Sequence, residues 1–358
     1  MTEMTDTGNN WQPAGAVTGV GALPQQDVDA AVRCVARACP VVPFWPQLPQ
    51  HQQGERLLDQ ALAPLADLVE PNASAPWTYG LRPNVTLDAL LAALYEREPM
   101  AGVGDAAGLD AFERAWQGGS FAQARAVKGQ VLGPVTLGLH LYRGGQRARP
   151  FADHPMLMQA IGVYLARLAR RQAARLAALH ANALVFLAEP MLESLTVDSA
   201  TLAEPAGINA LSDVLQAVRD GGALAGVHVG RGDAAPWLEP LRPDVWAFDA
   251  HHDLAGFCAS DAGLAFVQNG GRVAFGLVPT GAALNGFSAE AAFTRWLQAA
   301  SVMGDVTAIA RQSLITATGG LGRVDPPALS ATMNFAHRVS YLVNWIASGQ
   351  HAMQNSSG

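Results

Sequence analysis

The chain has 358 residues and a formal net charge of −7 at pH 7; half of its residues are hydrophobic and 15% are charged. This length allows one large core or two average domains, and the composition argues against long disordered stretches. The negative charge gives no electrostatic reason to expect nucleic acid or an anionic membrane as a partner.

Cysteine usage and the N-terminal segment bear on the compartment. The three cysteines, Cys34, Cys39 and Cys258, do not make a disulfide framework, so a reducing compartment is favoured. Residues 1–15 are polar and lack the basic and apolar regions of a signal peptide. No apolar run approaches the roughly eighteen residues that a membrane span needs. We therefore expect a cytoplasmic protein.

Between a flexible N-terminus (1–15) and a flexible C-terminal tail (348–358), short apolar runs alternate with longer helical patterns. This alternation is typical of βα units. The predicted strands are 16–20, 126–131, 183–187, 223–229, 245–249, 272–278 and 313–316. An eighth strand is expected from either 41–44 or 77–80.

The predicted helices have apolar residues at helical spacing and recognisable ends; they are 153–180, 204–221, 288–304 and 327–346. Asp153 is expected to cap the first of them. Together these elements predict one α/β domain over 16–347, a single (β/α)8 TIM barrel with additional N-terminal helices and loops. An open, doubly wound sheet is the alternative. No Gly-x-Gly-x-x-Gly turn follows the first strand, so no nucleotide cofactor is expected.

The active site of such a barrel lies at the C-terminal ends of its strands. Polar residues and glycines gather at the predicted strand ends, namely Gly21, Lys128, Gln130, Glu189, His228, Asp249, His251 and Thr280. Individually, Glu189 could be a surface cap, His228 a core histidine, and residues 249–253 a solvated loop. Their joint placement favours a concave polar site for a small-molecule substrate.

Several segments in order resemble the methionine synthase-like, cobalamin-independent branch of the uroporphyrinogen decarboxylase/methionine synthase barrel superfamily. They are 19–24, 42–49, 128–130 with Gly133-Pro134, 189–190, 226–228, 248–250, 276–280 and 320–322. The resemblance spans about residues 16–346. It implies methyl or alkyl transfer to a thiol, which a zinc ion presents as a thiolate, with folate or a corrinoid as methyl donor.

In that family the zinc ligands are a His-x-Cys pair, an acidic residue and a later Cys. On this chain the resemblance places them at His228, Gly230, Asp249 and Gly319, so both thiolates are missing. We expect no tight zinc site of the family type. An alternative N/O site could use His228, Asp249, Glu189 and His251 or His252.

The family's amino acid anchors have also changed. A Ser and an Asp that would hold the substrate fall on Ala22 and Ala188. The resemblance still implies catalytic roles for His228, Asp249 and Glu189. Substrate binding is expected from Lys128, Gln130, Gly21, Trp45, Thr280 and His251.

Three functions are consistent with these residues. The first is a methyltransferase-like enzyme that has diverged from homocysteine methylation. The second is a metal-free, uroporphyrinogen decarboxylase-like lyase with Asp249 or Glu189 as general acid, for which we would expect arginines in the cleft. Around the first strand end the sequence has none. The third is a non-catalytic barrel that binds a ligand in the old cleft.

Overall fold

The computed structural model describes residues 11–52, 54–73, 77–98, 106–142, 150–192, 204–230, 238–284 and 286–349. Within these ranges the main sheet has seven strands in the order β1-β10-β9-β8-β7-β6-β4, and all neighbouring strands are parallel. The strands are β1 Ala16–Val17, β4 Val127–Leu132, β6 Ala183–Glu189, β7 Leu224–Val229, β8 Val245–Phe248, β9 Arg272–Val278 and β10 Ser313–Ala317. The seven firmly predicted strands are thus confirmed within a few residues.

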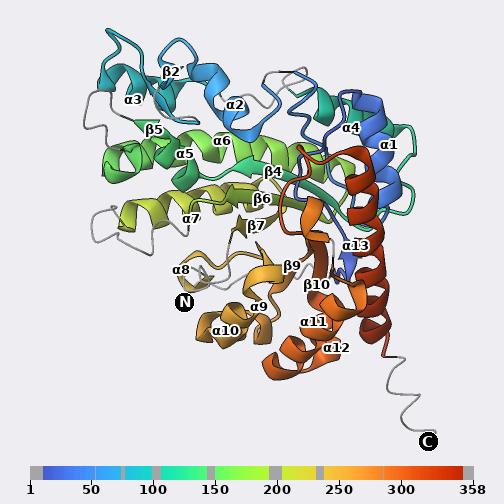
Figure 1. Ribbon diagram of the computed structural model, residues 1–358. Coiled ribbons are helices and arrows are strands. Elements are labelled where there is room, and N and C mark those ends of the chain that lie inside the picture. Colours follow the sequence, from blue (N-terminus) through green and yellow to red (C-terminus); the bar gives the residue numbers. More distant parts are fainter. Residues whose placement is uncertain are drawn as a thin grey trace, which may run out of the picture.

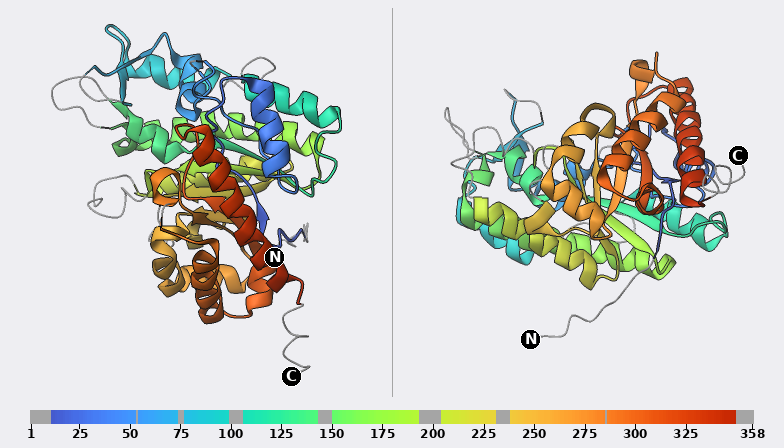
Figure 2. Two further views of the ribbon diagram at one scale, coloured as in Figure 1. Left: turned by 45° about the vertical axis from the view of Figure 1, so that its right-hand side comes forward. Right: turned by 90° about the horizontal axis from the view of Figure 1, so that it is seen from below.

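Helices surround this curled sheet (Figure 1). Those before β6 are α1 Val28–Ala38, α2 Leu57–Leu62, α3 Leu87–Glu96, α4 Ala107–Gln117, α5 Pro134–His140 and α6 Pro155–Leu179. Those after it are α7 Glu204–Asp220, α8 Leu238–Leu241, α9 Ala250–Ala259, α10 Asp261–Gln268, α11 Ala289–Met303, α12 Val306–Gln312 and α13 Pro326–Ala347. Helix α6 packs on β4 and β6, and α13 packs on β1, β9 and β10 (Figure 2).

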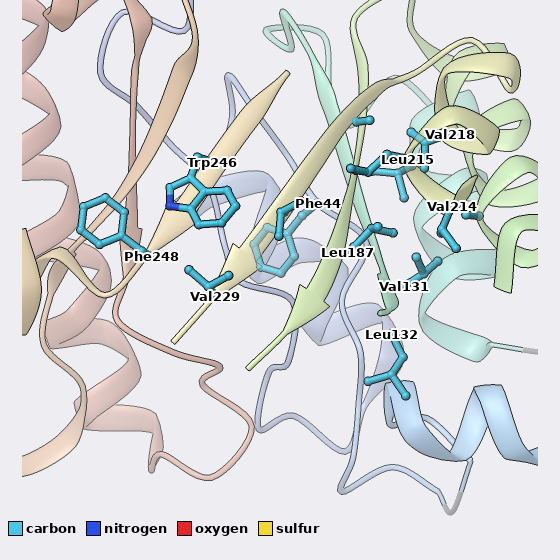
Figure 3. Close-up of a cluster of buried hydrophobic side chains, with 14 of the residues drawn as sticks. Phe44, Val131, Leu132, Leu187, Val214, Leu215, Val218, Val229, Trp246 and Phe248 are labelled. Atoms are coloured by element: carbon cyan, nitrogen blue, oxygen red, sulfur yellow. The ribbon is translucent and has the colours of Figure 1, made fainter. Parts of the chain in front are cut away.

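The strands bury side chains on both faces, as expected of a parallel sheet covered by helices. On the outer face, Val131 and Leu187 lie opposite Val214 and Leu215 of α7 (Figure 3). The inner face carries a separate, smaller cluster that includes Trp11, Val42, Ala126, Leu184, Phe186, Val245, Ala247, Ala274 and Leu314. This inner cluster fills one end of the space that the sheet encloses.

The four predicted helices are present, but the start of one was wrong. Asp153 lies in a short 3-10 helix, Phe151–Asp153, and His154 is the N-cap of α6 without a side-chain hydrogen bond. Pro155 takes the first helical position, where its missing N–H has no helical partner to lose. Helix α11 begins within one residue of its predicted start, and Ser288 is its N-cap, which accepts a hydrogen bond from the backbone N–H of Ala291.

Neither candidate for an eighth strand forms a regular strand of the main sheet, and the two candidates lie in different places. Residues 41–47 contain no strand, but Phe44 forms a parallel bridge with Lys128 of β4, and Gln47 forms one with Ala22 beyond β1. This irregular segment therefore lies beside both edges of the seven-stranded sheet. The other candidate, 77–80, overlaps β3 (Tyr79–Leu81), which belongs to a separate sheet with β2 (Val69–Pro71) and β5 (Leu141–Tyr142).

Residues 11–15 fall within the segment predicted to be flexible, yet they contact strand β9 and helix α13. The backbone oxygen of Trp11 accepts a hydrogen bond from Arg272, and that of Ala14 accepts one from Asn344 of α13. The N-terminal segment and the last helix thus lie side by side (Figure 2). The remaining parts of the predicted flexible ends, 1–10 and 350–358, lie outside the described residues.

Among the described residues, no helix combines the length and the apolar character that crossing a membrane would require.

Candidate functional site

A cavity of about 250 Å³ lies at the carboxyl ends of the strands. Its wall is formed by Gly19, Val20, Ala22, Gln47, Pro49, Arg56, Leu57, Lys128, Gln130, Phe186, Ala188, His228, Ala247, Ala274, Thr316 and Gly320. Phe186, Ala247 and Ala274 also belong to the inner cluster, so that cluster forms the floor of the cavity. The position matches the active-site face of a parallel barrel.

The charges of this wall are of one sign. Its ionisable side chains are Arg56, Lys128 and His228, and it contains no aspartate or glutamate. The whole chain carries a net charge of −7, so the cavity differs from the bulk of the molecule. A basic cavity of this kind is suited to an anionic ligand.

Lys128 lies on β4 and is only 3% exposed. Its Nζ donates to the backbone oxygen of Val20 and to Oε1 of Gln130, both over 3.1 Å, and lies 4.8 Å from the ring centre of Phe186. Burial lowers the pKa of Lys128 to about 7, and the nearby Cys39 opposes this shift. No carboxylate of the described residues forms an ion pair with it.

Lys128 is also the only lysine among the 358 residues. The other 22 of the 23 lysine and arginine residues are arginines. The resemblance had indicated a substrate-binding role for Lys128, but this count is the sequence signal that would have singled it out. A lysine amine can lose its proton when buried, whereas an arginine guanidinium keeps its charge in proteins.

His228 reaches the cavity from the end of β7. Burial, together with the positive charge of Lys128, lowers the pKa of His228 to about 4. The lowered pKa keeps the imidazole neutral at neutral pH. Its ring makes no hydrogen bond or ion pair to the described residues, so its nitrogens are available to a ligand. His228 is thus one of the predicted site residues that the structure places at the cavity.

Arg56, which the sequence analysis did not single out, is the third basic residue of the wall. It is the residue before α2, and its Nε donates to Asp59 over 2.7 Å. Its guanidinium lies 4.8 Å from the ring centre of Trp77, which also stacks under Arg323. The Arg56 side chain is 39% exposed, so it lies at the mouth of the cavity, where it packs on the exposed ring of Trp77. Arg56 comes from a loop region far from any predicted strand end, which is why the strand pattern missed it.

Glu189 does not line the cavity, although it ends β6 as expected. Its carboxylate accepts hydrogen bonds from the N–H groups of Val135 and Thr136 and from the Thr136 hydroxyl. It thereby caps the start of α5. Burial raises the pKa of Glu189 to about 7, and these hydrogen bonds act in the opposite direction. The surface-cap alternative was right about the role of this residue but wrong about its exposure, because Glu189 is fully buried.

Asp249 is likewise a helix cap. It precedes α9, accepts a hydrogen bond from the His252 N–H, and lies 2.7 Å from Nδ1 of the same histidine. His251 packs against Phe287 instead of the cavity. Thr280 is half-buried and also lies outside the wall, which contains Thr316 of β10. Asp249, His251 and Thr280, like Glu189, are therefore not brought to the cavity.

Gln130, Gly21 and Trp45 support the wall in different ways. Gln130 lines the cavity, and its Nε2 donates to the backbone oxygen of Trp45 over 3.2 Å. Gly21 has φ +151, and a Cβ there would lie 2.7 Å from the Gln130 side chain. A larger residue at position 21 would therefore displace the Gln130 side chain. Trp45 is fully buried in the core, against the expectation that it contacts a substrate.

The donor set does not fit the zinc site that the resemblance implies. The thiolate positions are Gly230 and Gly319, and the Asp249 carboxylate is engaged with His252. Of the expected ligands, His228 alone lines the cavity. Within the described ranges, no group of three or more His, Cys, Asp or Glu side chains could hold a metal ion.

The parallel curled sheet, with helices outside it and a basic cavity at the carboxyl ends of its strands, defines an α/β, barrel-like architecture. No family model and no curated protein matches the chain. Among solved structures it is similar to a B12-independent methionine synthase from Shewanella sp. W3-18-1, in complex with selenomethionine. The TM-score is 0.55 at 12% identity, over 92% of this chain and 97% of that chain. At this identity the likeness shows a methionine synthase-like fold.

Proposed function

We propose that the chain is a (β/α)8 barrel in which residues 41–47 occupy the eighth strand position. The parallel bridges of Phe44 with Lys128 and of Gln47 with Ala22 support this arrangement. So do the backbone hydrogen bonds from Lys128 to Pro43 and from Gln47 to Gly21. A closed barrel explains why one end of the interior holds an apolar cluster while the other end is a cavity.

We further propose that this cavity binds a small organic acid. The observation that carries the proposal is Lys128, a wall residue that no carboxylate of the described residues pairs with; Arg56 stands in the same wall, with only its Nε engaged by Asp59. A buried cation without a counterion is costly, and an anionic ligand would offset that cost. The volume of about 250 Å³ limits the ligand to a small molecule.

In this proposal the chain is a methionine synthase-like protein that has diverged from zinc-dependent methylation of homocysteine. The shared fold supports the relationship. Divergence is supported by alanine at the two anchor positions, Ala22 and Ala188, both of which line the cavity. A lyase that uses Asp249 or Glu189 as general acid has less support, because neither carboxylate lines the wall. A methyl or alkyl transfer with another acceptor remains compatible with the cavity.

Calorimetric titration with a panel of small acids tests the binding proposal. Lactate, pyruvate, succinate and alanine would distinguish monoacids, diacids and amino acids. We expect saturable binding of at least one acid, weakened about tenfold or more by Lys128→Gln or Arg56→Gln, which corresponds to about 1.4 kcal/mol. Arg82→Gln is the matched control, because Arg82 lies outside the wall and pairs with Glu70. No binding by any acid, or binding that all three variants leave unchanged, would overturn the proposal.

A further inference from the structure

The environment of the Lys128 nitrogen leaves one of its bonding directions open. Two directions are occupied, by the backbone oxygen of Val20 and by Oε1 of Gln130. The Gln130 amide is held in that orientation because its Nε2 donates to Trp45. Among the described residues there is no third hydrogen-bond acceptor for Nζ. In a neutral amine this third direction is that of the lone pair, so the nucleophilic electrons are not engaged by the protein.

The surroundings make the neutral amine accessible beside the ammonium ion near neutral pH. Phe186, Ala188, Ala247 and Ala274 line the same cavity as Lys128. Such an apolar wall disfavours charge, in line with the lowering of the Lys128 pKa to about 7. A desolvated lysine in an apolar pocket is the form that attacks carbonyl groups.

The residue type is informative in this chain. Of the 23 lysine and arginine positions, the 22 besides Lys128 are arginine, and one of these, Arg56, lines the cavity. If a fixed positive charge were all that this position required, arginine would supply it. The amine of a lysine differs from a guanidinium in that it becomes a nucleophile on losing its proton.

From this geometry we propose that Lys128 forms a Schiff base with a 2-oxo acid bound in the strand-end cavity. The inference rests on the proposed acid-binding function and adds the substrate class and a covalent step. The Nζ lone pair forms a bond to the carbonyl carbon, and the carbonyl electron pair moves to its oxygen. Both hydrogens of the neutral amine then leave with that oxygen as water, and a carbon–nitrogen double bond remains.

Two other residues of the wall suit this substrate. Arg56 binds Asp59 through Nε, so its two terminal nitrogens are available to a carboxylate at the mouth. The neutral imidazole of His228, which lines the same wall, can form a hydrogen bond with the carbonyl oxygen and with the hydroxyl group that forms from it. A 2-oxo acid carries its carboxylate next to its carbonyl group. The carboxylate suits the cationic Arg56 and the carbonyl group suits the Lys128 amine, and both residues line the same cavity.

Reductive trapping tests the inference on the full chain. The protein is incubated with pyruvate, or with glyoxylate, and sodium cyanoborohydride, and its intact and peptide masses are then measured. A reduced Schiff base adds the mass of the oxo acid less one oxygen atom. Because Lys128 is the only lysine, the N-terminal amine is the one other primary amine, and the peptide map separates the two sites. We expect one adduct, at Lys128.

Variants make the result specific. Lys128→Arg keeps the charge and Lys128→Met keeps the length without it; both should lose the adduct while circular dichroism verifies the fold. Arg56→Gln should slow trapping of pyruvate by about tenfold or more and leave trapping of acetaldehyde, which has no carboxylate, unchanged. An adduct confined to the N-terminal amine would overturn the inference.

Lactate separates this inference from the proposed function, because it has the carboxylate but no carbonyl to form an imine. If lactate and pyruvate bind saturably but pyruvate is not trapped at Lys128, the Schiff base is wrong and the acid-binding function stands. If no acid of the panel binds and neither oxo acid is trapped, both proposals fail.

Discussion

Glu189 and Thr136 are joined by two hydrogen bonds that connect the end of β6 to the first turn of α5. The Thr136 hydroxyl and N–H donate to the same carboxylate oxygen over 2.5 and 2.8 Å, while Val135 donates to the other over 2.9 Å. A Cβ at Gly133 would lie 2.1 Å from Oε1, so a glycine there leaves room for the carboxylate. The positive end of the helix dipole adds to this attraction.

Replacing Glu189 by Gln should therefore destabilise the fold without opening the cavity. In glutamine one of the two carboxylate oxygens is replaced by an NH2 group. That group faces hydrogen-bond donors, so at least one of the hydrogen bonds from Val135 and Thr136 is lost. We expect the free energy of unfolding to fall by about 1–3 kcal/mol, measured by urea denaturation. Thr136→Val is the partner variant, and the double variant should lose less than the sum of the two losses. Strictly additive losses would show that the two side chains do not act together.

The lowered pKa of His228 predicts a loss of stability in acid. The unfolded imidazole has a pKa of 6.5 and the folded one about 4, so between these values the unfolded state binds a proton that the folded state does not. Stability is therefore fully present above pH 6.5 and is lost as the pH falls towards 4, with a slope of up to about 1.4 kcal/mol per pH unit.

Urea unfolding of the wild type and of His228→Gln, from pH 7.5 to 4.5, measures this contribution. The difference between the two proteins isolates His228, because the other histidines with a lowered pKa, His140, His180 and His251, are present in both. The wild type should lose stability faster than the variant below pH 6.5. Parallel curves over that window would contradict the buried, neutral histidine.

The barrel-like order of strands could be predicted because its signal is local. Each strand is a short apolar run between helical patterns, and seven such runs form the parallel sheet. The edge at 41–47 could not be decided in the same way. Its proline-interrupted segment pairs through isolated bridges at Phe44 and Gln47, and no propensity distinguishes these from the pairing of Tyr79 in the smaller sheet.

The site was predicted only where the side-chain direction follows from the strand itself. Lys128 and Gln130 are two residues apart on β4 and so share its inner face. Glu189 and Asp249 stand at strand ends, where the backbone turns into the next segment, and both carboxylates go to helix N-termini. A carboxylate at a strand end can face either a ligand or the free N–H groups of a helix start. Which of the two it reaches depends on where the helix lies in space, and neighbouring residues in the sequence do not reveal that position.

The donor set at the strand ends predicts that the purified chain does not methylate homocysteine. Zinc-dependent catalysis needs thiolate ligands to hold the metal that activates the substrate thiol, and glycines stand at both positions, Gly230 and Gly319. We expect no methionine from homocysteine with methyl-folate or methylcorrinoid, measured by mass spectrometry, and less than one zinc per chain by elemental analysis. An active zinc-dependent methionine synthase in the same assay is the control. Turnover that accompanies stoichiometric zinc would contradict this prediction.

A carboxylate built into the cavity should compete with the proposed ligand. Ala188 lines the wall and is the register partner of His228 on the neighbouring strand, so Ala188→Asp places an internal anion in the cavity that holds Lys128. Ala188→Asn has nearly the same shape without the charge. We expect the Asp variant to bind pyruvate and lactate about tenfold or more weakly than the Asn variant, a difference of about 1.4 kcal/mol.

Calorimetric titration of the two variants, with thermal unfolding to verify their folds, measures this difference. The comparison separates charge from volume, since both side chains fill the same space. Neutralising the cavity should also make Lys128 a better-paired cation, so the Asp variant should lose affinity for acids without losing stability relative to Asn. Equal affinities in the two variants would mean that the acid is bound elsewhere. An acid bound beside Lys128 and Arg56 would be repelled by a second negative charge in so small a cavity.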